Sequence, residues 1–246
     1  MVPLREELEF TPPVRRSVVE FLIQSADNLE FRPIIKYSAL SLFADRFYPS
    51  LSNSTRIHHW LLKPIRESNL QLFAIISLWI SSKFHDSHPL SVEYLKAYAD
   101  NRIKDQHFTK RDFLDAEVLF MQVLNFEIGT STTAFAFLED LLTEFKKTAR
   151  VGELVSFDAA MDILDLLYET DEVLDRSVGC SVALAAAIMV ASYVITAPKQ
   201  RPEFPALPWL KFVTSCREEE IAPIVREILQ HVIAPSGRKS FSWARI

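Results

Sequence analysis

Two uncharged stretches decide the fold: NLQLFAIISLWISS at residues 69–82, which ends at Lys83, and SVGCSVALAAAIMVASYVITAP at residues 177–198, between Arg176 and Lys199. Wound as a helix, each is apolar on nearly every side, which is typical of a helix enclosed by other helices. The second stretch is also long enough to span a bilayer. Its serine, threonine and glycine residues, and its abundance of alanine over leucine, favour a buried core helix.

The sequence around these stretches predicts amphipathic helices. Apolar residues recur at helical spacing in residues 12–24, 109–124, 135–145 and 221–229. The second of these segments begins like a capping box, with Thr109 followed three residues later by the carboxylate of Asp112. Helix breakers are scarce, since the chain has four glycines in all and a long central region without proline. No stretch alternates as a strand does, so an all-α fold is predicted.

The two central stretches lie about 110 residues apart, and each has amphipathic helices before and after it. This arrangement predicts two tandem helical bundles, each built around one buried central helix and joined near Gly129. The expected boundaries are a short N-terminal segment, a first bundle, a second bundle and a short tail, at residues 1–11, 12–128, 129–234 and 235–246.

Composition argues against several classes of function. The net charge of −5 disfavours nucleic acid as the main partner, because phosphate binding needs a clustered basic face. The glycines are too far apart for a phosphate-binding loop, and Cys180 and Cys216 fit neither a disulfide framework nor a zinc pattern. The N-terminus MVPLREELEF has no apolar core of a secretory signal. A chain in the nucleus or the cytoplasm, bound to neither membrane nor nucleic acid, is expected.

One acidic helix is the best candidate for an enzyme site. In SFDAAMDILDLLYETDE the carboxylates share one helix face, as in all-helical isoprenoid enzymes that hold Mg²⁺ against a diphosphate: Asp158, Asp162, Asp165 and Glu169. Apolar residues on the other side, and the lack of a second acidic motif, favour a solvated face. The histidines also show no ligand cluster. We therefore expect no catalytic residue, metal or cofactor.

Lys83 and Glu117 are unusual because both stand on apolar helix stripes. A carboxylate amid an apolar face costs several kcal/mol unless another group satisfies it. Two interpretations are open from the residues alone. The two side chains are either an internal ion pair at the rim of the core, or a polar pair within an apolar surface that bonds backbone groups of a partner protein.

Four spaced motifs together resemble the cyclin box: ADRF at 44–47, NLQLF at 69–73, SSKF at 81–84 and TKRDFLDAEVLFMQVLNFEI at 109–128. The resemblance covers about residues 12–128, whereas residues 130–234 match the C-terminal cyclin fold in helix pattern only. The chain is most similar to the plant J-type cyclins. The resemblance implies two repeats of about five helices and a non-catalytic, activating subunit of a cyclin-dependent serine/threonine protein kinase, acting in cell-division control.

The resemblance also assigns site residues. It implies that Lys83 and Glu117 bond the backbone flanking the kinase αC helix and reposition that helix, whose glutamate must pair with the catalytic lysine. The apolar surface around this pair would consist of Ile80, Phe84, Met121, Phe126 and Ile128. Arg15 and Asp45 are expected to form an internal structural ion pair.

Many cyclins also dock substrates and inhibitors on their first helix. The matching positions here are Val14, Val18, Phe21, Gln24, Leu70 and Gln71. Two positions depart from the family pattern, because Ser17 replaces an apolar residue and Phe21 replaces a tryptophan. A further departure, PSLSNSTRIHHWLLKP at 49–64, predicts an added loop and a short helix.

An alternative function is a transcription factor or adaptor that shares the cyclin fold and works without a kinase. Such a factor needs a basic face to contact DNA, and this chain is net acidic.

Overall fold

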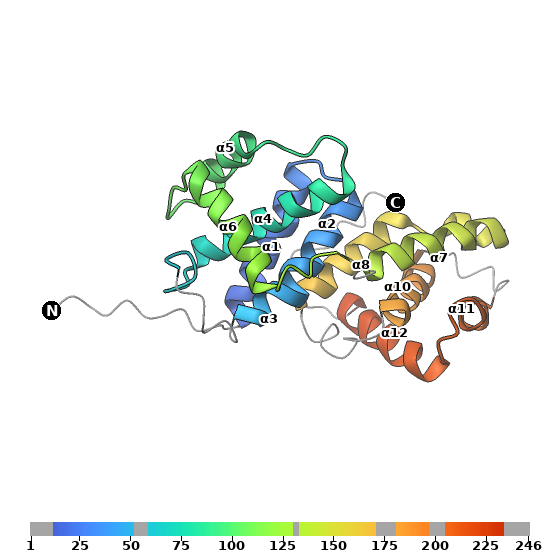
Figure 1. Cartoon of the computed structure of the whole chain (residues 1–246). Coiled ribbons are helices and arrows are strands. Elements are labelled where there is room, and N and C mark those ends of the chain that lie inside the picture. The colour runs from blue at the N-terminus through green and yellow to red at the C-terminus, as the bar shows by residue number, and fades with distance from the viewer. Residues whose placement is uncertain (1–11, 52–58, 130–132, 171–180, 197–204, 234–246) are drawn as a thin grey trace. The chain divides into compact units, whose positions relative to one another are not determined.

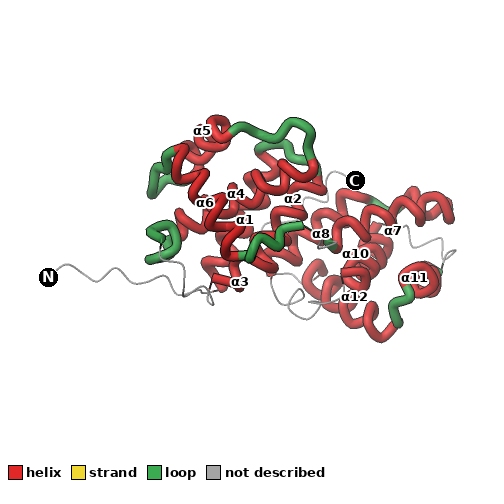
Figure 2. Tube along the Cα trace, viewed as in Figure 1, coloured by secondary structure: helices red, strands yellow, loops and turns green. Residues whose placement is uncertain are grey.

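The computed structural model describes residues 12–51, 59–129, 133–170, 181–196 and 205–233. Within these ranges the chain consists of helices and connecting loops, and no strand occurs (Figure 2). The predicted all-α fold is confirmed.

The described residues divide into two compact units. The first contains those up to Ala136, together with Tyr168–Thr170. The second contains Phe137–Leu167 and the described residues from 181 onward. Two helical bundles are thus present, as the sequence predicted.

The first unit is built around one buried helix. Its elements are α1 (Pro12–Asn28), α2 (Pro33–Leu40), the π-helix η1 (Ser41–Phe47), α3 (Tyr48–Leu51), α4 (Glu67–His85), α5 (Val92–Arg102) and α6 (Lys110–Val123). Helix α4 contacts α1, α2, α5 and α6, which surround it (Figure 1). The stretch 69–82 is therefore the central helix that its apolar sequence predicted. The insertion at 49–64 contains most of α3 and a turn, and its residues 52–58 lie outside the described part.

Aromatic side chains fill the interior of this unit. The ring of Phe47 lies parallel to that of Phe120 at a centroid distance of 4.3 Å, and 4.8 Å from that of Phe73. The hydroxyls of Ser77 and Ser82 donate to backbone carbonyls three residues earlier, both at 2.7 Å. These two buried hydroxyls therefore keep a hydrogen bond inside α4.

The start of α6 is set by a capping box. The backbone N–H of Asp112 donates to Thr109 Oγ1 at 3.3 Å, and the backbone N–H of Thr109 donates to Asp112 Oδ2 at 2.7 Å. These bonds satisfy donors that the first turn of a helix otherwise leaves unpaired. The capping box expected from the sequence is confirmed.

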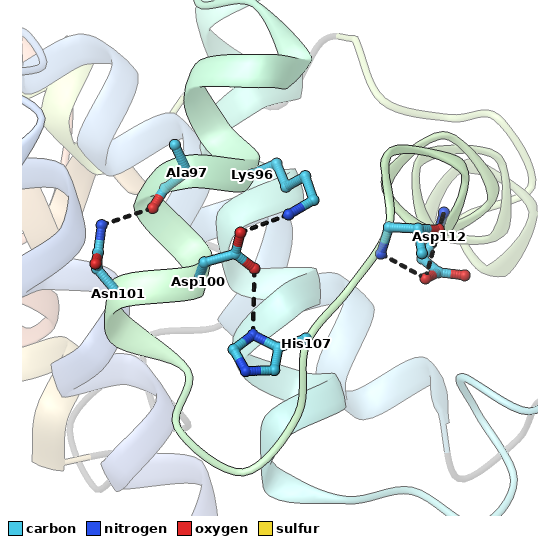
Figure 3. Close-up of polar contacts among 7 residues, drawn as sticks. Lys96, Ala97, Asp100, Asn101, His107 and Asp112 are labelled. Carbon is cyan, nitrogen blue, oxygen red and sulfur yellow. Dashed lines mark hydrogen bonds and ion pairs between the residues drawn. The ribbon is translucent and has the colours of Figure 1, made fainter.

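The connection that leads into α6 is tied to α5 by Asp100. Figure 3 shows Lys96 and His107 pointing toward this carboxylate, at 2.5 Å and 3.5 Å. The hydrogen bond from Lys96 lowers the pKa of Asp100, and the bond from His107 lowers it further. This cluster spans α5 and the loop before α6, so it helps to fix the direction in which α6 leaves α5.

The second unit is built around α10. Its elements are α7 (Ala134–Thr148) from Phe137 onward, the 3₁₀ helix η2 (Arg150–Leu154), α8 (Phe157–Thr170) up to Leu167, α10 (Ser181–Thr196), α11 (Ala206–Thr214) and α12 (Glu218–Ile233). Helix α10 contacts α11 and α12, and most of its side chains are buried. Phe145 packs edge-on against Tyr193 at 6.1 Å and lies 5.1 Å from Trp209.

Helix α10 corresponds to the second apolar stretch, of which residues 177–180, 197 and 198 lie outside the described part. It is buried among helices, as expected for a core helix. Among the helices that the structure describes, none combines the length and apolarity that crossing a membrane requires.

Candidate functional site

Lys83 and Glu117 are in contact. Lys83 lies in the last turn of α4 and Glu117 lies midway along α6, and Lys83 Nζ donates to Glu117 Oε1 at 2.5 Å. The lysine side chain is 37% exposed and the glutamate side chain 17%. The two polar groups that interrupt apolar stripes in the sequence therefore satisfy each other, with the lysine reaching solvent.

Large apolar side chains near the ends of α4 and α6 remain exposed. Phe84, next to the lysine, is 57% exposed, and Phe126, just beyond the end of α6, is 62% exposed. Two further exposed residues on α6, Leu114 and Val118, were not anticipated. Leu114 and Val118 are four residues apart and therefore share one face of α6, which is the sequence signal that could have identified them.

Of the other residues expected on this surface, Met121 and Ile128 are half-buried. Ile80 is only 2% exposed and belongs to the core of the first unit. It is therefore not part of the exposed surface. We use the name Lys83 surface for the exposed and half-buried apolar residues at the end of α4, on α6 and in the segment after α6: Phe84, Leu114, Val118, Met121, Phe126 and Ile128.

A pocket of about 230 Å³ opens beside the Lys83 surface. Its walls include Phe84 and His85 from the end of α4, Ile128 from the segment after α6, and Leu42 and Arg46 from η1. Partial desolvation, and then the nearby Arg32 guanidinium, lower the pKa of His85, so its imidazole is uncharged at neutral pH. The pocket thus has an apolar wall with an uncharged histidine and an arginine at its edge.

The chain after α6 turns sharply to place Phe126. Asn125 and Phe126 have φ angles of 52° and 60°, in the left-handed region that bulky residues adopt at a cost. The turn is held because the N–H of Phe126 donates to the Met121 carbonyl at 2.7 Å, and because Arg46 donates to the Glu127 carbonyl. Arg46 of η1 therefore fixes the segment that exposes Phe126.

Arg15 and Asp45, the expected structural pair, both contact Tyr168, which belongs to the first unit. Arg15 Nη1 donates to the Tyr168 carbonyl at 3.3 Å, and the Tyr168 hydroxyl donates to Asp45 Oδ2 at 3.4 Å. Burial, reinforced by the charge of Asp45, raises the pKa of the Tyr168 phenol well above its ordinary value. The sequence did not indicate Tyr168 as a partner, because it lies more than 120 residues from Asp45.

The residues expected to form a docking patch lie on α1 and α4, which pack against each other. Val18 and Leu70 are buried, Val14, Phe21 and Gln71 are half-buried, and Gln24 is exposed. The hydroxyl of Ser17, where the family pattern has an apolar residue, donates to Glu67 Oε1 at 2.6 Å. A polar bridge therefore joins α1 to the start of α4 beside these residues.

Of the four carboxylates on the acidic face of α8, Asp158 and Asp162 are exposed, and Asp165 and Glu169 are half-buried. Its Glu169 lies 3.9 Å from the Arg16 guanidinium. Within the described ranges, no three His, Cys, Asp or Glu side chains are grouped closely enough to hold a metal ion.

Comparisons with known proteins agree on one protein family. Residues 2–129 match the family model of the cyclin N-terminal domain. The chain is 54% identical over 225 residues to cyclin-J18 of Arabidopsis thaliana, covering 89% of this chain and 95% of that protein. It is 46% identical over 239 residues to the cyclin-J18-like protein of Oryza sativa subsp. japonica, covering 93% and 90%.

More distant proteins share part of the sequence or the fold. Cyclin-A1 of Mus musculus is 26% identical over 192 residues, which cover 78% of this chain and 40% of that protein. The X-ray structure of a viral cyclin from herpesvirus saimiri has a TM-score of 0.67 at 15% identity, over 92% of this chain and 87% of that one. That structure shows the same helical fold. The family model spans more than half of the chain and the J18 relatives span nearly all of it, so this protein belongs to the cyclin family and, within it, to the plant J-type cyclins.

Proposed function

We propose that this cyclin is the activating subunit of a cyclin-dependent serine/threonine kinase, acting in cell-division control in the nucleus or the cytoplasm. The observation that carries the proposal is the Lys83–Glu117 pair, whose lysine reaches solvent next to Phe84, together with the exposed side chains of Phe84 and Phe126 close to the ends of α4 and α6. In this proposal the chain supplies no catalytic group, and ATP and the phosphoryl-transfer chemistry belong to the kinase.

The polar pair would determine the orientation of the kinase αC helix. A lysine ammonium has three N–H donors and a carboxylate has several lone pairs, so their mutual bond leaves each with capacity for a partner. Backbone carbonyl and N–H groups flanking the kinase αC helix would use that capacity. Because the bonds form only at one register, they orient αC for its own glutamate to reach the catalytic lysine.

The apolar residues supply free energy. Moving a two-state kinase from about 1:99 to 99:1 in favour of its active form takes roughly 5.5 kcal/mol of differential binding. Full burial of one large apolar side chain contributes about 1.5–3 kcal/mol. Phe84 and Phe126 are already partly buried, so each contributes less than this amount and neighbouring apolar residues must contribute the rest of the binding free energy. An apolar kinase side chain entering the pocket beside Phe84 would add to this sum.

The test compares Lys83→Ala and Glu117→Ala with the unchanged chain in a pull-down with a purified cyclin-dependent kinase, followed by a histone kinase assay. Either substitution leaves a charged partner unsatisfied in the interface, so binding should weaken about tenfold or more. Lys110→Ala is the matched control, since it breaks the exposed pair that Lys110, on the same helix as Glu117, forms at 2.8 Å with Glu93 of α5. It should leave binding unchanged.

Normal kinase binding by both Lys83→Ala and Glu117→Ala would contradict the proposal. A chain that copurifies with no kinase and confers no histone phosphorylation would instead favour the cyclin-fold adaptor or transcription factor. The docking of substrates or inhibitors at the α1–α4 patch is a separate part of the proposal. It requires that Phe21→Ala reduce phosphorylation of some substrates while leaving kinase binding intact.

A further inference from the structure

Trp79 holds the side chain of Lys83 in place. It lies one helical turn before the lysine on α4, and Lys83 Nζ is 3.5 Å from the centroid of its ring. A cation over an indole face is attracted by the ring quadrupole, and this attraction strengthens where water is excluded. Trp79 is almost fully buried, so the ammonium rests on a surface that the core keeps still.

A hydrogen bond in turn fixes the orientation of the Trp79 ring. Its indole Nε1–H donates to the Leu90 carbonyl at 2.9 Å, in the connection between α4 and α5. This bond sets the plane of the ring, and the plane sets where the ammonium can rest. The lysine is thus held from two directions, by the ring of Trp79 below and by the Glu117 carboxylate on α6.

A lysine on an open surface samples many rotamers, and a partner that binds it must immobilise the side chain. Here the position is already restricted in the free protein, while part of the side chain stays exposed. We propose that Trp79 is a positioning residue that preorganises the Lys83 ammonium to donate to the backbone of the kinase. The inference rests on the proposed function and adds to it a residue that the motif containing Lys83 does not include.

The geometry is tested in the free protein by NMR. An aromatic face this near the ammonium shifts the ε-methylene protons of Lys83 upfield through the ring current, and Lys83→Met identifies the signal by its loss. Trp79→Leu should return these protons to ordinary lysine values, and Trp79→Phe should retain part of the shift. Ordinary values in the unchanged chain would overturn the inference, even where Trp79→Leu fails to fold.

The role in binding is tested by a double-mutant cycle against a purified cyclin-dependent kinase. Trp79→Leu should weaken binding roughly three- to tenfold, the range for one side chain that must be immobilised on binding. In the Lys83→Met background the same change should have little effect, because no ammonium remains to be positioned. Trp60→Leu, at a half-exposed tryptophan that stacks on Phe108, is the matched control and should bind normally.

An equal loss of affinity from Trp79→Leu with and without Lys83 would show that Trp79 supports only the fold, and would overturn the inference. Normal kinase binding by Lys83→Met would instead contradict the proposed function, and with it the role of Trp79 in binding. The two failures are distinguishable, because the first leaves Lys83→Met defective and the second does not. Circular dichroism of each variant checks that the helices are retained.

Discussion

Tyr168 is a buried residue of the first unit whose two polar groups bond to Arg15 and Asp45. Its carbonyl accepts from Arg15 and its hydroxyl donates to Asp45. Ionising the phenol would place a second negative charge next to the Asp45 carboxylate, away from water. The folded protein therefore keeps the proton more tightly than the unfolded chain does, which is why the pKa of Tyr168 is raised.

This raised pKa predicts a stability change at high pH. Above about 10, the ordinary tyrosine pKa, the unfolded chain releases this proton while the folded chain retains it. The free energy of unfolding should therefore fall as the pH rises through and above that value. Urea unfolding at pH values on either side of about 10 measures the effect in the full chain.

Tyr168→Phe is the matched variant. It should be less stable near neutral pH by about 1 kcal/mol, through loss of one hydrogen bond, and its stability should fall less steeply above pH 10. An identical slope in the two proteins would show that Tyr168 does not hold its proton as the structure implies.

The sequence pointed to two residues of the candidate site, Lys83 and Glu117, which are in contact in the structure. Lys83 and Glu117 stand in family motifs, and their unusual position on apolar stripes was visible from spacing alone. Trp79 and Arg46 were not anticipated as contributors, because their roles depend on where a ring face and a guanidinium end up in space. Ile80 was expected on the surface but is buried. The helix before Lys83 is apolar on nearly every side, so its sequence does not reveal which side faces solvent.

Among the elements, α6 depends on its first turn. Thr109→Ala removes the hydroxyl that accepts from the Asp112 N–H, leaving a helix donor unsatisfied. The free energy of unfolding should fall by about 1 kcal/mol, as measured by urea denaturation. Kinase affinity of the folded protein should not change, because Thr109 lies away from Lys83 and Glu117 in the described helix.

Thr148→Ala is the control for this prediction. Its hydroxyl donates to the Glu144 carbonyl at 2.8 Å at the other end of a helix, α7, and caps no N-terminal donor. Its effect should stay within about 0.5 kcal/mol. A loss for Thr109→Ala no larger than that of the control would contradict the importance of the capping box.

Two local features, a π-helix and a left-handed turn, could not be predicted from the helical spacing of apolar residues. Residues 44–47 form part of the π-helix η1, where one extra residue per turn changes which side chains face inward. The left-handed turn at Asn125 and Phe126 follows α6 directly, and only Asn125 is a residue that commonly adopts it. Both features are stabilised by contacts with other elements, so helical periodicity could not predict them.

For the whole molecule, the extent of the first unit is testable. A boundary at residue 128 was expected, whereas the described residues of the first unit extend to Ala136. The difference matters because Phe135 is buried and its ring stacks on Tyr37 at 5.0 Å. A fragment of residues 12–136 should be more stable than one of residues 12–128 by about 2–4 kcal/mol, from one buried aromatic side chain and its ring contact.

Urea unfolding of the two fragments measures this difference, and Phe135→Ala in the full chain provides the check that requires no truncation. The substitution should lower the free energy of unfolding by about 3–5 kcal/mol, as expected for a large buried side chain. Fragments of equal stability, with a full-chain variant close to the unchanged protein, would show that the first unit ends before Phe135.

The sequence by itself determined the helical class, the two central helices, the capping box of α6 and the positions of Lys83 and Glu117. These properties depend on local spacing, on helix breakers and on motifs of neighbouring residues, all of which are present in the linear order. The tertiary structure decided that Trp79 lies beneath Lys83, that Arg46 holds the turn at Phe126, and that Tyr168 meets Arg15 and Asp45. Those contacts join residues on different elements or depend on side-chain direction, which only the packing of the helices sets.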